Sequence, residues 1–288
     1  MLFKADTGFV TFAQNNERTD YLRMAYIQAL SAKIFMPQIP YAVIIDKETN
    51  SQMLYKYKKV FDYVEVLNDD DAKFQDWKMN NEYKLYWVTP FRETIKLEAD
   101  MVFTRDISHW LNGMRTNEVL LTTTVTNYRN ENVFKSPYRQ QFLENSLPSV
   151  YNGFSYFRNS GLMLRFFETC KHITNNWNQM SEKILKGRFE QLTTDILYGL
   201  AAKLVGENSC TNNVLEYPKF VHMKGGIYGE SSNDDWTKRF YYEIDDNARL
   251  RVGFTNQVYP FHYYQKHWIT DELEEKYERC YRRIFKGY

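Results

Sequence analysis

Two carboxylates stand two residues apart directly after an apolar segment. The run 94–97, Thr-Ile-Lys-Leu, is typical of a strand, and Glu98 and Asp100 follow it with Ala99 between them. Side chains at positions i and i+2 of a strand point the same way, so both acids can face one cation. Hard divalent cations such as Mn²⁺ and Mg²⁺ prefer oxygen ligands, and the small alanine leaves room for a bulky ligand. The alternative is a pair of solvated loop acids.

Two further segments contain residues suited to binding a ligand. Asn152 can hydrogen-bond hydroxyl groups, and Gly153 allows close approach of the backbone; the alternative is an ordinary Asn-Gly turn. Thr194 and Asp195 open a stretch of helical periodicity. There Thr194 can simply be the helix N-cap, and Asp195 can favour the helix dipole.

Short apolar runs alternate with segments of helical periodicity along the chain. The runs predict strands at 8–13, 41–45, 60–67, 94–97, 120–126 and 151–158. Helices are predicted at 22–30, 80–88, 162–177 and 194–204, the first capped by Thr19 or Asp20 and the last stopped by Gly206. This alternation favours an α/β fold with a mostly parallel sheet covered by helices. Ligands of such sheets bind beyond the carboxyl ends of the strands, which singles out Gln14, Asp46, Glu98, Asp100 and Asn152.

The composition is that of a globular protein. The 288 residues are 43% hydrophobic and 25% charged, with a formal net charge of +1. This charge excludes a strongly basic nucleic-acid coat and an acidic tail, but it does not exclude an enzyme that acts on DNA, since one local basic patch is enough for that. Cys170, Cys210 and Cys280 form no C-x-x-C pair, which suits a reducing cytosol. We expect a cytoplasmic protein that does not engage a membrane, because no stretch approaches 18 uninterrupted apolar residues and the first residues lack the apolar core of a signal peptide.

The motifs around the two carboxylates resemble those of family 8 glycosyltransferases and their GT-A relatives. Residues 84–87 read K-L-Y-W, a Thr-Pro turn follows, and the next strand ends in E-A-D. The family has K-L-x-x-W, a short turn, and a strand that ends in D-x-D. The resemblance implies that Asp100 binds the metal and that Glu98 helps to hold the donor ribose and the metal, with a reach one carbon longer than the family's aspartate. It also places Lys84 near the donor; a solvated helix lysine is the alternative.

Later segments match in the family's order. Asn152 and Gly153 resemble the segment that lines the sugar pocket, and Asp195 resembles the acid that contacts the transferred sugar. The resemblance therefore implies that Asn152 and Asp195 act at the sugar, where a carboxylate stabilises positive charge that develops on the ring.

The segment 220–226, F-V-H-M-K-G-G, resembles the family's late H-x-x-G motif. The resemblance implies that His222 is the remaining protein ligand of the metal, and that Lys224 and Gly225 hold the donor diphosphate. A second histidine, His262, follows another apolar segment. It can replace or assist His222, bind the acceptor, or have a structural role.

The N-terminal strand and turn resemble the part of GT-A enzymes that cradles the nucleotide base. By this resemblance Thr11, Phe12 and Tyr21 contact the nucleotide. Tyr21 can stack on a uracil, or it can belong to the buried face of its helix. The implied donor is a UDP-sugar, and the implied cofactor is Mn²⁺ or Mg²⁺.

The chain from T-G-F-V-T-F-A-Q-N to F-H-Y-Y also resembles a group of uncharacterised glycosyltransferase-like proteins of tailed bacteriophages. Some phages glycosylate hydroxymethylated bases of their own DNA, so the resemblance implies 5-hydroxymethylcytosine in double-stranded DNA as the acceptor. The alternatives are a cell-surface or small-molecule glycan acceptor, and a catalytically inactive GT-A module that binds DNA or sugar. We expect a GT-A domain over residues 1–265 and a helical extension over 266–288, whose basic and aromatic end suits a phosphate backbone or a capping helix.

Overall fold

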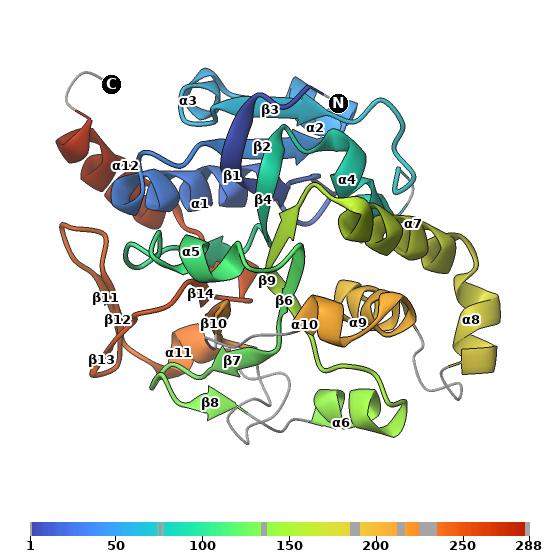
Figure 1. Cartoon of the computed structure of the whole chain (residues 1–288). Coiled ribbons are helices and arrows are strands. Elements are labelled where there is room, and N and C mark those ends of the chain that lie inside the picture. Colours follow the sequence, from blue (N-terminus) through green and yellow to red (C-terminus); the bar gives the residue numbers. More distant parts are fainter. Residues whose placement is uncertain are drawn as a thin grey trace.

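The computed structural model describes residues 2–73, 75, 78–133, 137–184, 191–211, 217–224 and 235–285. The described strands form three sheets, and helices pack on both faces of the largest one (Figure 1). This is the α/β arrangement that the alternation of apolar runs and helical segments predicts.

The central sheet has six strands in the order β3 (Tyr63–Val66), β2 (Tyr41–Ile45), β1 (Ala5–Phe12), β4 (Phe91–Leu97), β9 (Tyr151–Arg158) and β6 (Val119–Thr122). The first four strands of this order run parallel to one another. β9 runs antiparallel to both of its neighbours. The prediction of a mostly parallel sheet is therefore confirmed.

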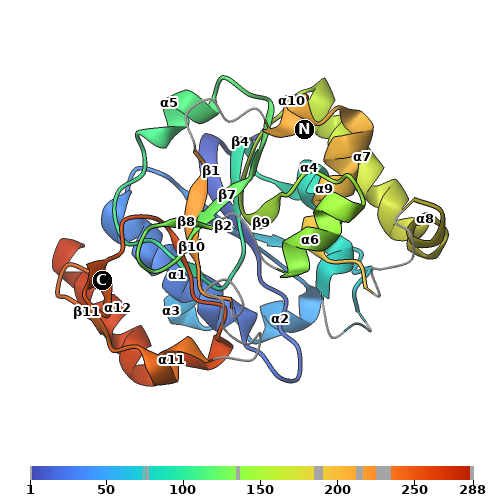
Figure 2. The same cartoon turned by 90° about the horizontal axis from the view of Figure 1, so that it is seen from below.

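A second sheet has the order β5 (Met101–Val102), β14 (Phe261–His262), β10 (Lys219–His222), β7 (Thr124–Thr126) and β8 (Asn132–Val133). Figure 1 shows it below the central sheet, and Figure 2 shows β10, β7 and β8 from that side. A small antiparallel sheet contains β11 (Tyr242–Ile244), β12 (Leu250–Val252) and β13 (Thr255–Asn256). The second sheet joins early and late parts of the chain, because β5 directly follows β4 in sequence whereas β14 belongs to the last thirty residues.

Helices bury two separate cores against the two faces of the central sheet. Phe9 belongs to one core and Val10 to the other, as successive strand residues point to opposite faces. The first core includes α1 (Tyr21–Phe35) and α12 (Asp271–Ile284). The second includes α4 (Leu85–Val88), α7 (Gly161–Asn175), α9 (Thr194–Val205) and the 3₁₀ helix η1 (Lys78–Lys84).

The remaining helices are short. They are α2 (Lys47–Ser51), α3 (Tyr55–Lys58), α5 (Trp110–Met114), α6 (Pro137–Glu144), α8 (Trp177–Ile184), α10 (Asn208–Thr211), α11 (Trp236–Arg239) and the 3₁₀ helix η2 (Lys266–Trp268). Within the described ranges, no helix has both the length and the apolar character needed to cross a bilayer.

Capping residues set the ends of the main helices, and ion pairs join two of these helices. Asp20 is the N-cap of α1 and accepts a hydrogen bond from the Arg23 N–H, and Gly206 ends α9 with a φ of 112°. The predicted C-terminal helix is present as α12, which packs beside α1 (Figure 1). Arg23 ties the two helices together through Asp271 and Glu274, each at 2.5 Å.

Besides the helix expected at 80–88, which forms the 3₁₀ helix η1 up to Lys84 and α4 from Leu85, two predicted elements are divided in the structure. The run 120–126 was expected to form one strand, but it forms β6 and β7 in different sheets. The chain leaves the central sheet at Thr122, where the pairing with β9 shifts and the Thr122 hydroxyl donates to the Phe154 carbonyl. The segment 162–177 was expected to form one helix, but α7 ends at its C-cap, Asn176, and α8 begins at Trp177. Neither break contains a glycine or a proline, so periodicity alone does not indicate it.

Gly8 lies within β1 under the ring of Phe91. A Cβ added at Gly8 would lie 2.3 Å from Phe91 Cζ, and Phe91 is itself fully buried. Because the ring and the strand have little room to move, we expect Gly8→Ala to lower the free energy of unfolding by about 1–3 kcal/mol in urea denaturation. Gly161→Ala is the control, since its Cβ would lie 3.7 Å from Arg165 Nη1 at the start of a helix and should cause no loss. Equal destabilisation by both changes would contradict this explanation.

Candidate active site

A cavity of about 870 Å³ opens at the carboxyl ends of β1 and β4. Its walls come from both halves of the chain, including the start of β9, the start of α9 and the segments that contain β10 and β14. Gln14, Glu98, Asp100 and Asn152, four of the strand-end residues singled out from the sequence, line it. The cavity thus occupies the place where parallel sheets bind their ligands.

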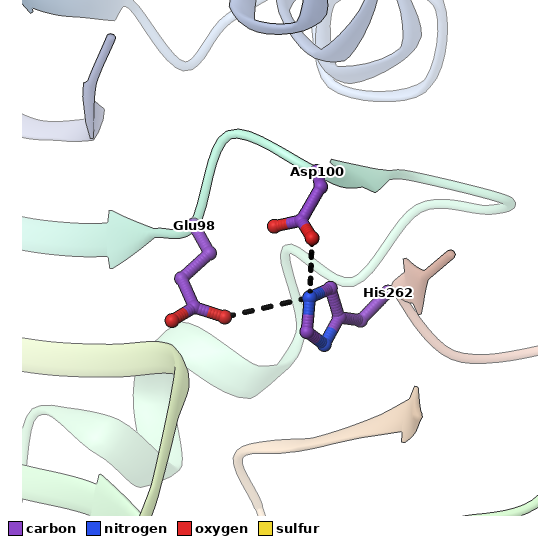
Figure 3. Close-up of side chains that lie close together, drawn as sticks. All are labelled: Glu98, Asp100 and His262. Atoms are coloured by element: carbon purple, nitrogen blue, oxygen red, sulfur yellow. Dashed lines mark ion pairs between the residues drawn. The ribbon is translucent and has the colours of Figure 1, made fainter. Parts of the chain in front are cut away.

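Glu98, Asp100 and His262 converge on one wall of this cavity (Figure 3). Nε2 of His262 lies 2.8 Å from Asp100 Oδ2 and 3.5 Å from Glu98 Oε2. One ligand atom from each of the three residues lies within 4.8 Å of the others. Two carboxylates and one imidazole are a donor set that suits Mn²⁺ and related divalent cations. The side chains therefore fit a cation of the kind that the sequence predicted.

Strand pairing brings the histidine to the carboxylates. Glu98 follows β4 directly, and Asp100 immediately precedes β5. β5 pairs antiparallel with β14, so that Met101 lies opposite His262. The Tyr263 N–H donates to the Asp100 carbonyl at 3.1 Å and extends this pairing by one hydrogen bond.

His222 also lines the cavity, on β10, one strand further than His262 from the strand that follows the carboxylates. β10 and β14 pair in parallel with His222 opposite His262. The two rings are stacked with their centroids 4.5 Å apart, and their Nδ1 atoms lie 2.8 Å apart, so one ring donates a hydrogen bond to the other. Burial, and then the neighbouring His262, hold the pKa of His222 well below its ordinary value. His222 is therefore neutral at neutral pH.

The two carboxylates have opposite pKa shifts. Burial raises the pKa of Glu98. Burial alone would also raise the pKa of Asp100, but His262 and Lys266 outweigh it and hold this pKa well below the ordinary value. A positive charge beside the carboxylate produces the shift at Asp100, and the same kind of charge would favour ionisation of Glu98.

Lys266 is a component of the site that the sequence analysis did not identify. Its ammonium group pairs with Asp100 Oδ2, the oxygen that also faces His262. The chain returns to Asp100 through a tight turn centred on Tyr264, which has a φ of 60° and is spanned by a 2.6 Å hydrogen bond from the Gln265 N–H to the Tyr263 carbonyl. Lys266 follows His262 by four residues, and this short separation after a candidate ligand was the available signal.

Asn152 and Asp195 lie together on the side of the cavity next to Glu98. The Asn152 N–H donates to Asp195 Oδ1 at 2.8 Å, and Asn152 Nδ2 donates to Glu98 Oε1 at 3.3 Å. Arg139, which the sequence analysis did not consider, pairs with Asp195 Oδ2. Its guanidinium also stacks on the Tyr151 ring and donates to the Val150 carbonyl, so it is held from three sides.

Some of the other residues named from the sequence line the same cavity, and some do not. Phe12, Tyr21, Gly153 and Lys224 line the cavity. Thr11 lies in the core, where its hydroxyl donates to Gln28 Oε1.

Besides Thr11, two more of the named residues are not placed at the cavity by the described structure. The ammonium of Lys84 lies 3.2 Å from Asp71 Oδ2 and also donates to the Asp69 carbonyl. Gly225 lies outside the described residues.

Comparisons with known proteins find likeness in structure rather than in sequence. No protein-family model matches the chain, and no curated protein sequence matches it. A solved structure of the galactosyltransferase LgtC in complex with donor and acceptor sugar analogues matches over 95% of both chains, with 14% identity and a TM-score of 0.51. The glycosyltransferase GlyE of Streptococcus pneumoniae TIGR4 matches over 98% of this chain and 63% of its own, with 10% identity and a TM-score of 0.47.

The match to LgtC supports one conclusion, which concerns the fold. It extends over nearly the whole of both chains. This chain has the GT-A fold of glycosyltransferases.

Proposed function

We propose that this chain is a glycosyltransferase that moves a sugar from a UDP-sugar donor to an acceptor with the help of a divalent cation. The observation that carries the proposal is the convergence of Glu98, Asp100 and His262 on one wall of the cavity. The GT-A fold supports it, because the LgtC structure that shares this fold is a galactosyltransferase bound to donor and acceptor sugar analogues.

The residues at and around the candidate cation site have different roles in this proposal. Glu98, Asp100 and His262 would hold the cation, which supplies Lewis-acid stabilisation of the departing diphosphate. With Nε2 of His262 turned to the cation, the proton of this ring would lie on Nδ1 and would be donated to Nδ1 of His222, which is 2.8 Å away. Lys224 and Lys266 line the same cavity and provide positive charge for phosphate oxygens.

Asn152 and Asp195 form the side of the cavity where we place the transferred sugar. Oδ1 of Asn152 is buried and has no hydrogen-bond partner among the described residues. A buried amide oxygen without a partner is unfavourable, and a sugar hydroxyl would satisfy it. Asp195 provides the carboxylate that stabilises positive charge on the sugar ring as the bond to the diphosphate breaks.

Arg139 positions Asp195 in this account. Arg139→Ala removes the ion pair and lets the carboxylate turn, so we expect kcat for donor turnover to fall about 10- to 100-fold with a smaller change in KM. Arg139→Lys keeps the charge and should recover part of the loss. The control is Arg115→Ala, which removes an exposed pair with Glu93 and should leave turnover unchanged. Steady-state kinetics of the three variants measure the effect, and an unchanged kcat in Arg139→Ala would exclude this role.

The nucleotide end of the cavity is assigned to the β1 side. Phe12 and Tyr21 line it there, and an aromatic ring can stack on a base. The choice of uridine as the base rests on the resemblance of the first strand and turn to those of GT-A enzymes.

We propose 5-hydroxymethylcytosine in double-stranded DNA as the acceptor. This choice rests on the resemblance of the chain to glycosyltransferase-like proteins of tailed bacteriophages, since the net charge of +1 provides no general attraction to DNA. A cell-surface or small-molecule glycan is the alternative acceptor.

A panel of nucleotide-sugars tests the proposal. Each is incubated with the protein and Mn²⁺, with hydroxymethylated DNA, unmodified DNA or simple glycosides as acceptor, and the products are identified by mass spectrometry. We expect Mn²⁺-dependent consumption of a UDP-sugar and incorporation of the sugar into hydroxymethylated DNA. Transfer to a glycoside would replace the acceptor assignment. Binding of UDP without turnover of any sugar would instead indicate an inactive GT-A module.

A further inference from the structure

One oxygen of Asp100 is contacted by two positively polarised groups. Oδ2 pairs with the Lys266 ammonium and lies 2.8 Å from Nε2 of His262. Oδ2 is also the Asp100 oxygen that faces the histidine, so we expect a cation held by Glu98, Asp100 and His262 to bind this oxygen. A lysine ammonium and a divalent cation at the same carboxylate oxygen repel each other strongly, because both positive charges then lie within a few ångströms.

Lys266 is directed to Asp100 by the local fold. The turn at Tyr264 brings the chain back after β14. Trp268, two residues after Lys266, is fully buried and packs against Trp236 and Tyr263. Only the side chain of Lys266 must rotate for its ammonium to leave Asp100, because the buried tryptophan anchors the backbone. The side chain lines the cavity and is 36% exposed to solvent, which leaves room for this rotation.

Lys266 and Lys224 both lie close to the same tyrosine ring. The ring centroid of Tyr264 lies 5.8 Å from the Lys266 ammonium and 5.6 Å from the Lys224 ammonium. An anion bound over this part of the cavity would therefore lie within reach of both lysines. A diphosphate is such an anion, and it would offer Lys266 new oxygen partners in exchange for Asp100.

We propose that Lys266 competes with the divalent cation for Asp100, so that the cation and a nucleotide diphosphate bind cooperatively. The cation binds weakly while Lys266 pairs with Asp100. It binds tightly once the diphosphate draws the ammonium away, and linkage requires the cation to raise diphosphate affinity by the same factor. This inference rests on the proposed cation site and adds a regulation of that site.

Titration calorimetry with Mn²⁺ alone tests the competition. Lys266→Met removes the charge at similar size, so we expect the dissociation constant for Mn²⁺ to fall at least about tenfold relative to the wild type. Lys266→Arg keeps the charge and should bind Mn²⁺ as weakly as the wild type. Lys238→Met is the matched control, because Lys238 is exposed and pairs with Asp235, and its affinity should equal that of the wild type.

A second titration measures the coupling with UDP. We expect Mn²⁺ to raise the affinity of the wild type for UDP at least about tenfold, and to raise that of Lys266→Met by a smaller factor. Equal Mn²⁺ affinities of the wild type and Lys266→Met, with Mn²⁺ bound by both, would overturn the competition and leave the proposed function intact. Failure of every variant to bind Mn²⁺, with or without UDP, would overturn the cation site itself and the competition with it.

Discussion

Asp100→Asn is expected to abolish Mn²⁺ binding and to lower donor turnover at least about a thousandfold. Asp100 contributes the oxygen shared by His262 and Lys266, and its pKa is held low, so it is fully charged at neutral pH. A neutral amide at this position removes the charge that would hold the cation, and with it the stabilisation of the diphosphate in the transition state. Mn²⁺ titration and steady-state kinetics measure the two losses.

The control for this variant is Asp106→Asn. Asp106 is an exposed acid six residues further along, where it accepts a hydrogen bond from the Ser108 N–H. It should retain the Mn²⁺ affinity and turnover of the wild type. Because Asp100 is buried, its replacement could also unfold the chain. Circular dichroism of Asp100→Asn therefore checks that the variant is folded. A folded Asp100→Asn protein that still turns over donor in a Mn²⁺-dependent way would show that the cation lies elsewhere.

His262 and His222 are expected to contribute unequally to the affinity for Mn²⁺. His262→Phe removes the nitrogen that faces both carboxylates, so Mn²⁺ affinity should fall at least about a hundredfold. His222→Phe keeps a stacked ring but removes the hydrogen bond to His262 Nδ1, so affinity should fall by only about tenfold. Phenylalanine at both positions makes the pair a matched comparison. The reverse ranking would make His222 the ligand, as the family resemblance implies.

Local patterns in the sequence predicted much of the fold. Strands Tyr41–Ile45 and Tyr151–Arg158 coincide with the apolar runs, and Asp20 caps its helix as expected. These features depend on neighbouring residues, through alternation along a strand or a side chain that bonds the first turn of its own helix. The break between β6 and β7 depends instead on which sheet each half joins, and that is decided by contacts with distant strands.

The site shows the same contrast between features set by neighbouring residues, which the sequence predicted, and features set by distant strands, which it did not. Glu98 and Asp100 are two residues apart, so strand geometry alone could place them together. His262 reaches them because β14 pairs with β5, which lies about 160 residues earlier in the chain. Arg139, which lies in α6, reaches Asp195 across 56 residues of the chain. Spacing along the chain contains no information about such pairings, and histidine or arginine type alone does not distinguish a site residue from a structural one.

Anomalous X-ray scattering from a crystal soaked with Mn²⁺ and UDP tests the central claim most directly. We predict one strong manganese peak within about 2.3 Å of oxygens from Glu98 or Asp100 and of Nε2 of His262, in contact with the diphosphate. A manganese peak at another place, or UDP bound in the cavity with no manganese beside these three side chains, would contradict the account.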